Sequence, residues 1–234
     1  MLDDTDRAGE AEQPYQRALA IRIKALGGEH PDVAVSLSNL GYLFRKQQKY
    51  PEAEKLFRKA LAISEKNQDL SYMAFTLNSL GLVHDDMKQT AQAEGEYRKS
   101  LALYEGKLKG NPNIANVCFN LGNLLKQKGE IEETLTLLRK AEAAVQATLG
   151  AEHPQMAKAR HNLAVIHMTQ GKDLEEADRL FRSSRAILER VYGPDHPEVA
   201  SSLDNHARLL DSLNRKEEAE QLRQRVREIR AKRR

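Results

Sequence analysis

Apolar residues along this chain follow helical spacing. In residues 33–63 they recur at offsets of three and four: Leu37, Leu40 and Phe44 in one segment, then Ala53, Leu56, Phe57, Ala60 and Ile63 in the next. Such offsets place side chains on one face of an α-helix. The pattern therefore predicts two amphipathic helices joined by a short turn.

The same pattern recurs along the chain. Copies begin at Val33, Met73, Ile114, Met156 and Val199, and a partial copy starts at Glu10. The residues equivalent to Ala53 are Ala53, Ala93, Thr134, Ala177 and Ala219, with steps of 40, 41, 43 and 42 residues. Length differences fall in the expected turns, as a stack of repeats requires.

One position in the first helix of each copy is always small. It holds Gly41, Gly81, Gly122, Ala164 and Ala207. A glycine inside a helix costs roughly 1 kcal/mol relative to alanine. Its repeated use indicates that a neighbouring helix approaches closely at this position.

The repeats resemble a known family. Their shared pattern is L-G-x-x-(Y/F) in the first helix and A-x-x-x-(F/Y)-x-x-A in the second, with linkers GGEHPDVA (27–34), GAEHPQMA (150–157) and GPDHPEVA (193–200). This pattern is similar to the tetratricopeptide repeat, and the 42-residue length resembles the kinesin-light-chain class. The resemblance implies an all-α fold, a right-handed α-solenoid of stacked antiparallel helix pairs with about 11 helices.

The repeat boundaries predict the domain organisation. We expect a disordered or poorly ordered N-terminus over residues 1–9 and a single solenoid over 10–234. The solenoid would comprise a half repeat at 10–30 and repeats at 31–70, 71–111, 112–153, 154–196 and 197–234.

In the tetratricopeptide family one stripe of each first helix lines a concave surface, and the resemblance implies the same here. At one position of this stripe four of five residues are asparagine: Asn39, Ser79, Asn120, Asn162 and Asn205. A carboxamide can both donate to and accept from a peptide backbone. The alternative is that these side chains bond to a neighbouring repeat or face water. The predicted peptide-binding residues are Asn39, Tyr42, Arg45, Lys46, Asn78, Ser79, Leu82, Asn116, Phe119, Asn120, Asn123, Lys126, Lys158, His161, Asn162, Val165, Asn205 and Arg208.

Two residues break the apolar pattern. Arg160 stands at the position of Leu37, and His206 at the position of Leu40. Either could serve a function, but we favour repeats that tolerate poorer packing near an end.

Composition supports an all-helical protein without catalytic chemistry. The chain has no tryptophan, 5% aromatic residues and 30% charged residues, and phosphate-loop, nucleophile-elbow and zincin motifs do not occur. We expect no enzyme activity and no cofactor. His30, His153 and His196 each precede a proline, and we expect them to bond to the turn backbone instead of a metal. The single cysteine, Cys118, suits a reducing cytoplasmic setting.

Charge narrows the possible partners. The formal net charge is +3, and seven arginines and lysines lie in the last twelve residues. We interpret them as the solvated face of a terminal helix, so a nucleic-acid partner is not expected. The sequence contains no run of 18 or more apolar residues, so it predicts no membrane-spanning helix.

The sequence thus favours a non-enzymatic scaffold that binds a peptide segment of a partner protein. The alternative is a structural or self-association module of a larger assembly. Residues 14–26 form only a second helix, so the apolar face of Tyr15, Leu19 and Ile23 lacks a covering helix. A homodimer through this N-terminal edge is therefore a further possibility.

Overall fold

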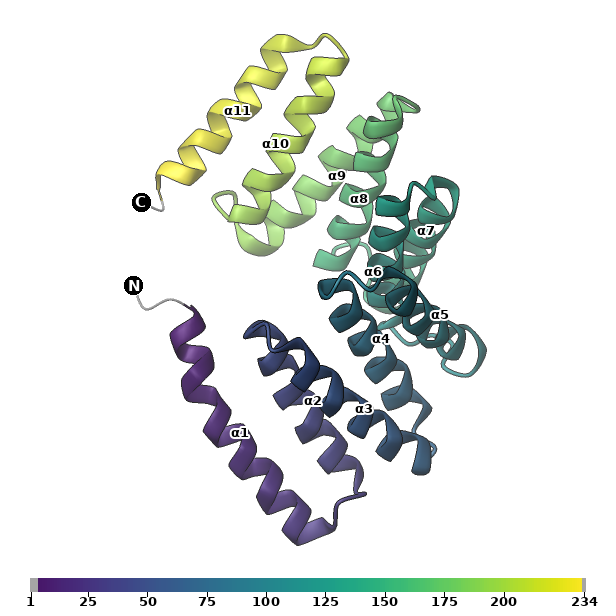
Figure 1. Ribbon diagram of the computed structural model, residues 1–234. Helices are drawn as coiled ribbons and strands as arrows, with labels where there is room; N and C mark the ends of the chain where they lie inside the picture. Colours follow the sequence, from purple (N-terminus) through teal and green to yellow (C-terminus); the bar gives the residue numbers. More distant parts are fainter. Residues whose placement is uncertain (1–3, 233–234) are drawn as a thin grey trace. The chain divides into compact units, whose positions relative to one another are not determined.

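The computed structural model describes residues 4–232, with side chains from residue 12 onward. Over this range the chain forms eleven α-helices (Figure 1). They are α1 (Asp4–Leu26), α2 (Pro31–Lys46), α3 (Tyr50–Lys66), α4 (Leu70–Asp86), α5 (Thr90–Gly106), α6 (Ile114–Lys128), α7 (Ile131–Thr148), α8 (Pro154–Gln170), α9 (Leu174–Tyr192), α10 (Pro197–Ser212) and α11 (Lys216–Ala231). The predicted all-α fold class is confirmed.

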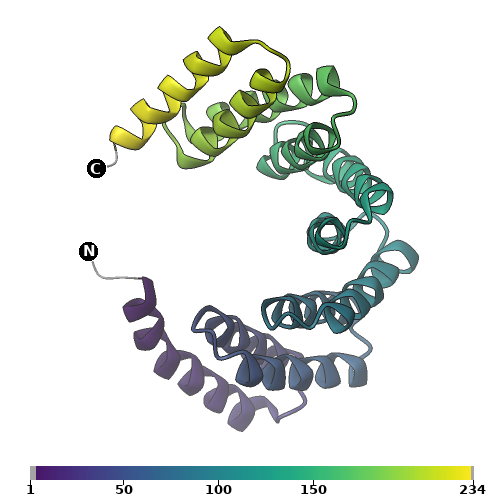
Figure 2. The same cartoon turned by 45° about the horizontal axis from the view of Figure 1, so that its top comes forward.

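The helices group into two compact units, Met1–Asn113 and Ile114–Arg234, where the sequence predicted one stack from residue 10. In the first unit α2 packs on α3 and α4 on α5, and α1 packs on α2. In the second unit the pairs are α6 with α7, α8 with α9, and α10 with α11. Within each unit successive pairs pack in series (Figure 2).

The close approach at the small positions is confirmed in two repeats and is looser in a third. The Gly41 backbone faces the Phe57 ring, and an added Cβ would lie 3.1 Å from it. At Gly81 an added Cβ would lie only 2.5 Å from the Tyr97 ring. At Gly122 the nearest atom would be 3.9 Å away, because leucine takes the aromatic position there.

Three of the turns inside the helix pairs place a residue other than glycine in a left-handed conformation, whereas the α6–α7 and α8–α9 turns use Gly129 and Gly171. Gln48, Lys88 and Asn214 have φ values of 61°, 62° and 59°. After Lys88, the Gln89 amide donates to the His84 carbonyl at 2.8 Å, which closes the end of α4. This geometry usually selects glycine, because a Cβ is crowded there. These turns therefore carry some backbone strain.

Both polar intrusions are hydrogen-bonded to neighbouring side chains, although the Nδ1 atom of His206 is buried without a partner among the described residues. The expectation of poorer packing stays a prediction. His206 is buried, and its Nε2 lies 2.5 Å from Asp178 Oδ1. Arg215 donates to the other oxygen of Asp178 at 2.8 Å. Arg160 donates to Glu142 at 3.0 Å and to Ser183 at 2.5 Å. Buried polar groups are tolerated when they are hydrogen-bonded in this way.

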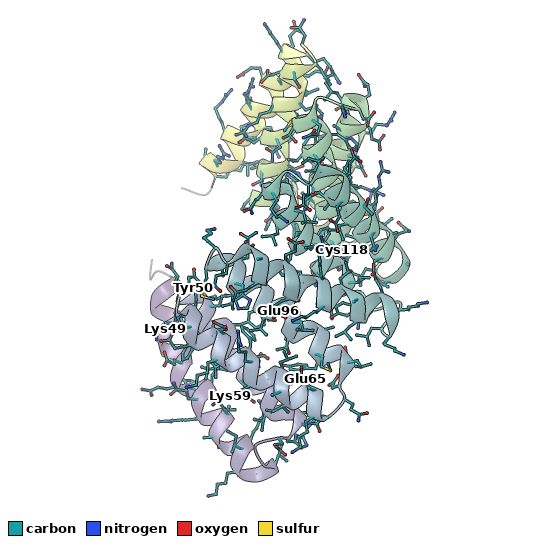
Figure 3. The ribbon with its side chains drawn as sticks, turned by 45° about the vertical axis from the view of Figure 1, so that its right-hand side comes forward. Lys49, Tyr50, Lys59, Glu65, Glu96 and Cys118 are labelled. Carbon is teal, nitrogen blue, oxygen red and sulfur yellow. The ribbon has the colours of Figure 1, made fainter. Side chains whose placement is uncertain are left out.

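Helix α1 forms one edge of the first unit. It begins at Asp4, so residues 4–9, expected to be poorly ordered, are helical, while residues 1–3 lie outside the described residues. Leu19 packs against the core of α2 and α3. Lys49 in the following turn forms an ion pair with Glu12 of α1 at 3.2 Å (Figure 3). Several apolar side chains of α1 nevertheless stay exposed: Tyr15 by 40%, Ile21 by 68%, Ile23 by 43% and Leu26 by 46%.

Candidate functional site

In the first unit, side chains of the predicted binding stripe are already hydrogen-bonded or ion-paired to side chains of the neighbouring repeat. The Tyr42 hydroxyl lies 2.8 Å from Ser79 Oγ, and Arg45 forms a two-contact ion pair with Asp86 at 2.5 and 3.3 Å. These contacts join α2 to α4. The Arg45 charge is thereby neutralised on the stripe itself.

Burial removes some predicted residues of the first unit from the surface. Ser79 is 0% exposed and Asn78 is 8% exposed, so these side chains contribute almost nothing to the exposed surface of the stripe. Tyr42 and Leu82 are half-buried, and the Tyr42 ring packs edge-on against Phe57. Of the carboxamide and basic candidates in this unit, Asn39 and Lys46 are exposed.

In the second unit, contacts link the first helices of neighbouring repeats. Gln155 of α8 donates to Asn116 of α6 at 3.2 Å. Asn205 of α10 lies 3.2 Å from the Nε2 atom of His161 on α8. These bonds engage Asn116 and Asn205 with side chains of the adjacent repeat. For Asn205, a member of the asparagine row, this was the alternative interpretation.

The other predicted residues of the second unit differ in exposure. Phe119 is fully buried, and the Lys158 ammonium lies over its ring, 4.6 Å from the centroid. The half-buried members are Asn120, Asn123, Asn162 and Val165, and the exposed members are Lys126, Lys158 and Arg208. Arg208 lies 3.8 Å from Asp204. The second unit therefore presents a mixed polar surface with Asn162 near its centre.

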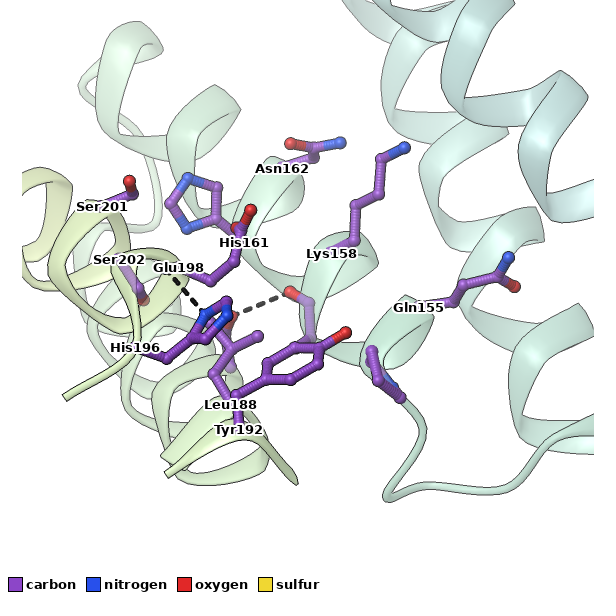
Figure 4. Close-up of a pocket in the computed structure, with 13 residues that line it drawn as sticks. Gln155, Lys158, His161, Asn162, Leu188, Tyr192, His196, Glu198, Ser201 and Ser202 are labelled. Carbon is purple, nitrogen blue, oxygen red and sulfur yellow. Dashed lines mark hydrogen bonds between the residues drawn. The ribbon is translucent and has the colours of Figure 1, made fainter. Parts of the chain in front are cut away.

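A pocket of about 570 Å³ opens beside Asn162, between α8, α9 and α10 (Figure 4). Lys158, His161 and Asn162 line it from α8, and Leu188 and Tyr192 line it from α9. Its α10 side carries Glu198, Ser201 and Ser202. The volume falls within the range of small-ligand sites, roughly 300–1,000 Å³.

Charged groups of both signs surround the pocket. Burial lowers the pKa of Lys158, while the Glu198 carboxylate acts to raise it. Burial also lowers the pKa of His161, and Glu198 opposes this shift as well. The lowered pKa favours the neutral imidazole, whose Nε2 can accept the hydrogen bond from Asn205. Glu198 places negative charge near both residues.

The helix starts at the pocket are already capped. His196 Nδ1 accepts from the Glu198 amide at 3.2 Å, and His153 Nδ1 accepts from the Gln155 amide at 3.2 Å. The prediction that these histidines bond to the turn backbone is confirmed. Because the caps occupy these donors, the two N-termini are poor sites for an anion. Residues 4–232 contain no cluster of three or more His, Cys, Asp or Glu arranged for a metal.

Sequence reasoning missed several pocket residues, among them Leu188, Tyr192, Glu198 and Ser202. Tyr192 stacks on His196 with ring centroids 4.6 Å apart. Ser202 is 2% exposed, and its hydroxyl has no hydrogen-bond partner among the described residues. These residues lie outside the asparagine stripe, at the junction between two repeats. The sequence signal that could have found them is the pair Leu188 and Ser202, because the equivalent positions of the first two repeats hold Arg22 and Ser36.

The described part of the chain thus defines an α-helical repeat protein built from stacked helix pairs. The family model for the tetratricopeptide repeat matches residues 4–66, 111–173 and 166–232. The chain belongs to the tetratricopeptide repeat family. Nephrocystin-3 of Xenopus laevis is 39% identical over 59 residues, which are 25% of this chain and 4% of that protein. The chain therefore spans only a small part of this curated relative.

Solved structures share the fold. BtubC (BKLC) from P. vanneervenii superposes with a TM-score of 0.80 and 20% identity, covering 97% of this chain and 89% of that one. A Podosopora anserina putative kinesin light chain gives 0.72 and 24%, covering 87% and 97%. YrrB, described as a TPR protein with an unusual peptide-binding site, gives 0.57 and 19%, covering 91% and 92%. The fold is therefore of the kinesin-light-chain type. No helix in the described residues is long and apolar enough to cross a membrane.

Proposed function

We propose that this chain is a non-enzymatic scaffold that holds an extended peptide segment of a partner on the second unit. The tetratricopeptide fold supports a protein–protein interaction scaffold. The proposed surface is the first-helix stripe of α6, α8 and α10. The observation that carries the proposal is the Asn162 side chain beside an open pocket, next to the exposed Lys158.

The carboxamides of this stripe divide into two groups. Asn116 and Asn205 bond to neighbouring repeats and would hold the helices in register. Asn123 and Asn162 are half-buried on the same stripe, and in the proposal they contact the peptide backbone. A carboxamide suits this role because it matches both a backbone N–H and a C=O.

The charges favour a partner segment of mixed composition. Lys126 and Lys158 are exposed on the stripe, whereas the Arg208 charge is countered by Asp204. Glu198 adds a negative group at the pocket. This arrangement does not support a simple preference for acidic peptides.

A displayed random-peptide library provides the test. Peptides enriched on the wild-type chain should bind the double variant Asn123→Ala, Asn162→Ala at least about tenfold more weakly, through the loss of two or more hydrogen bonds. The exposed first-unit change Asn39→Ala is the matched control and should leave this binding unchanged. Far-UV circular dichroism checks that each variant folds. Enriched peptides that bind the double variant as tightly as the wild type would contradict the proposal.

Self-association through α1 is the second candidate, because Ile21, Ile23 and Leu26 are exposed on this edge helix. Burying them would remove apolar area from water. If the candidate is correct, sedimentation equilibrium gives a mass that rises with concentration, and Ile21→Lys with Ile23→Lys restores the monomer. A wild-type mass that stays monomeric at every concentration excludes it.

A nucleic-acid partner is not part of the proposal, since basic side chains of α11 and of its C-cap residue have acidic neighbours. Arg223 pairs with Asp211, and both Arg225 and Lys232 pair with Asp195. Binding of DNA or RNA with a steep salt dependence would contradict the exclusion of a nucleic-acid partner. We place the scaffold in the cytoplasm, which suits the buried thiol of Cys118.

A further inference from the structure

The first and last junctions between repeats in the described chain occupy equivalent repeat positions but differ in chemistry. Between α1 and α2, Arg22 donates to the Ser36 hydroxyl at 2.5 Å. That hydroxyl in turn donates to the Asp32 carbonyl at 2.9 Å. The guanidinium thus reaches from the second helix of one repeat to the first turns of the next.

Between α9 and α10 the same two positions hold Leu188 and Ser202. Each pair lies in the same register, since Arg22 follows Ala18 by four residues as Leu188 follows Ser184. Leucine cannot donate a hydrogen bond, and the Ser202 hydroxyl is left buried and unpartnered. The pocket of about 570 Å³ opens at this junction.

Other junctions within the units avoid this mismatch. Between α3 and α4 the equivalent residues are Ser64 and Thr76, and each hydroxyl bonds to a carbonyl of its own helix, at 2.9 and 2.7 Å. Between α7 and α8 they are Val145 and Ala159, both apolar and fully buried. An unpartnered hydroxyl facing a pocket thus distinguishes the α9–α10 junction from these. Such a buried group costs free energy until a ligand bonds to it.

We infer that this pocket receives an arginine side chain of the partner, which takes the place that Arg22 fills at the first junction. The inference rests on the proposed function, because the partner segment would deliver the arginine. The guanidinium would donate to Ser202, and its aliphatic stem would pack on Leu188.

The rest of the pocket suits a planar cation. Glu198, which stands at the repeat position of Asp32, supplies a carboxylate to the pocket lining. The stacked Tyr192 and His196 rings offer aromatic surface, on which guanidinium groups stack favourably. The competing cation, Lys158, directs its ammonium toward Phe119 and away from Ser202 (Figure 4).

The test uses N-acetyl-arginine amide as the probe and needs no partner protein. Titration followed by two-dimensional NMR should move the amide signals around Ser202 and Tyr192. The neutral isostere N-acetyl-citrulline amide and the anion N-acetyl-glutamate amide should bind at least about tenfold more weakly, because they lack the charge-assisted hydrogen bonds.

Two variants locate the site. Leu188→Arg should abolish probe binding, because the chain's own guanidinium then bonds to the Ser202 hydroxyl, as Arg22 bonds to Ser36. Glu198→Gln changes an exposed side chain and should weaken binding by about tenfold while the fold is kept. Glu175→Gln, which removes an exposed carboxylate at the opposite end of α9, is the matched control for Glu198→Gln and should leave binding unchanged.

The outcomes separate this inference from the proposed function. Probe binding that is lost in Leu188→Arg and weakened in Glu198→Gln supports the arginine pocket. Equal or tighter binding of the citrulline or glutamate probe overturns it, as does the absence of shifts around Ser202. If the library peptides bind the double variant Asn123→Ala, Asn162→Ala as tightly as the wild type while the arginine probe still binds, only the proposed function is refuted.

Discussion

Replacing Gly81 with alanine tests whether close helix contact explains the recurring small residue. Two effects oppose each other. Alanine in a helix interior gains about 1 kcal/mol over glycine, whereas overpacking a filled core costs roughly 1–3 kcal/mol. The new Cβ would lie 2.5 Å from Cε1 and 2.6 Å from Cδ1 of Tyr97. Because the Tyr97 ring is fully buried and cannot swing into solvent, we expect a net loss of about 1 kcal/mol.

Gly122→Ala is the matched control. Its new Cβ would come no closer than 3.9 Å to Leu137 and Leu138, which is ordinary van der Waals contact. The propensity gain then acts almost unopposed, so this variant should be more stable by up to about 1 kcal/mol. The two substitutions should therefore differ by about 2 kcal/mol, even though they place the same residue at equivalent positions.

Amide hydrogen exchange is the suitable assay, because a chain with two compact units need not unfold in one step. Protection should fall in α4 and α5 for Gly81→Ala and rise in α6 and α7 for Gly122→Ala. Adding Tyr97→Leu to Gly81→Ala should remove most of the clash, since a leucine faces Gly122 in the next repeat. If both alanine variants change stability in the same direction and by the same amount, close contact does not explain the glycines.

Three further outcomes follow from local geometry. Lys88→Gly should stabilise the α4–α5 pair by roughly 1 kcal/mol, measured by amide hydrogen exchange, because Lys88 has a φ of 62°. No gain in protection would mean that the turn is unstrained. Burial alone would raise the pKa of Asp178, but hydrogen bonds from Arg215, His206 and Arg182 lower it to about 2. A lowered pKa contributes stability above the unfolded value of 3.8. The free energy of unfolding should therefore fall by on the order of 2 kcal/mol as the pH decreases from about 4 to about 2. Thermal melts over this pH range measure the loss, which should be smaller in Asp178→Asn. His196→Ala should cost about 1 kcal/mol through the lost helix cap, with His196→Asn restoring most of it; equal melting temperatures for the two variants would argue against the cap.

Much of the fold was predictable because the same spacing of apolar residues recurs in every repeat. Offsets of three and four residues specify amphipathic helices, and this information is local. The small positions could be identified from Gly41 and Gly81 recurring where a helix interior disfavours glycine. The structural role of His196 could be predicted because a cap involves neighbouring residues only.

The candidate site depended on contacts between repeats, which the sequence pattern does not encode. Asn162 and Asn205 occupy equivalent positions, yet Asn205 bonds to His161 while Asn162 lines a pocket. Ser79, at the same position, is completely buried.

The sequence by itself therefore determined the helix pairs, their order and their packing face, because each follows from spacing along one chain segment. The tertiary structure alone decided which side chains stay available to a ligand and where the pocket opens. The physical reason is that availability depends on small rotations and on side-chain reach between helices about forty residues apart. Leu188 stands at the position that Arg22 occupies in the first junction, and this difference leaves the helical pattern unchanged. It nevertheless leaves the Ser202 hydroxyl without a hydrogen-bond partner beside an open pocket.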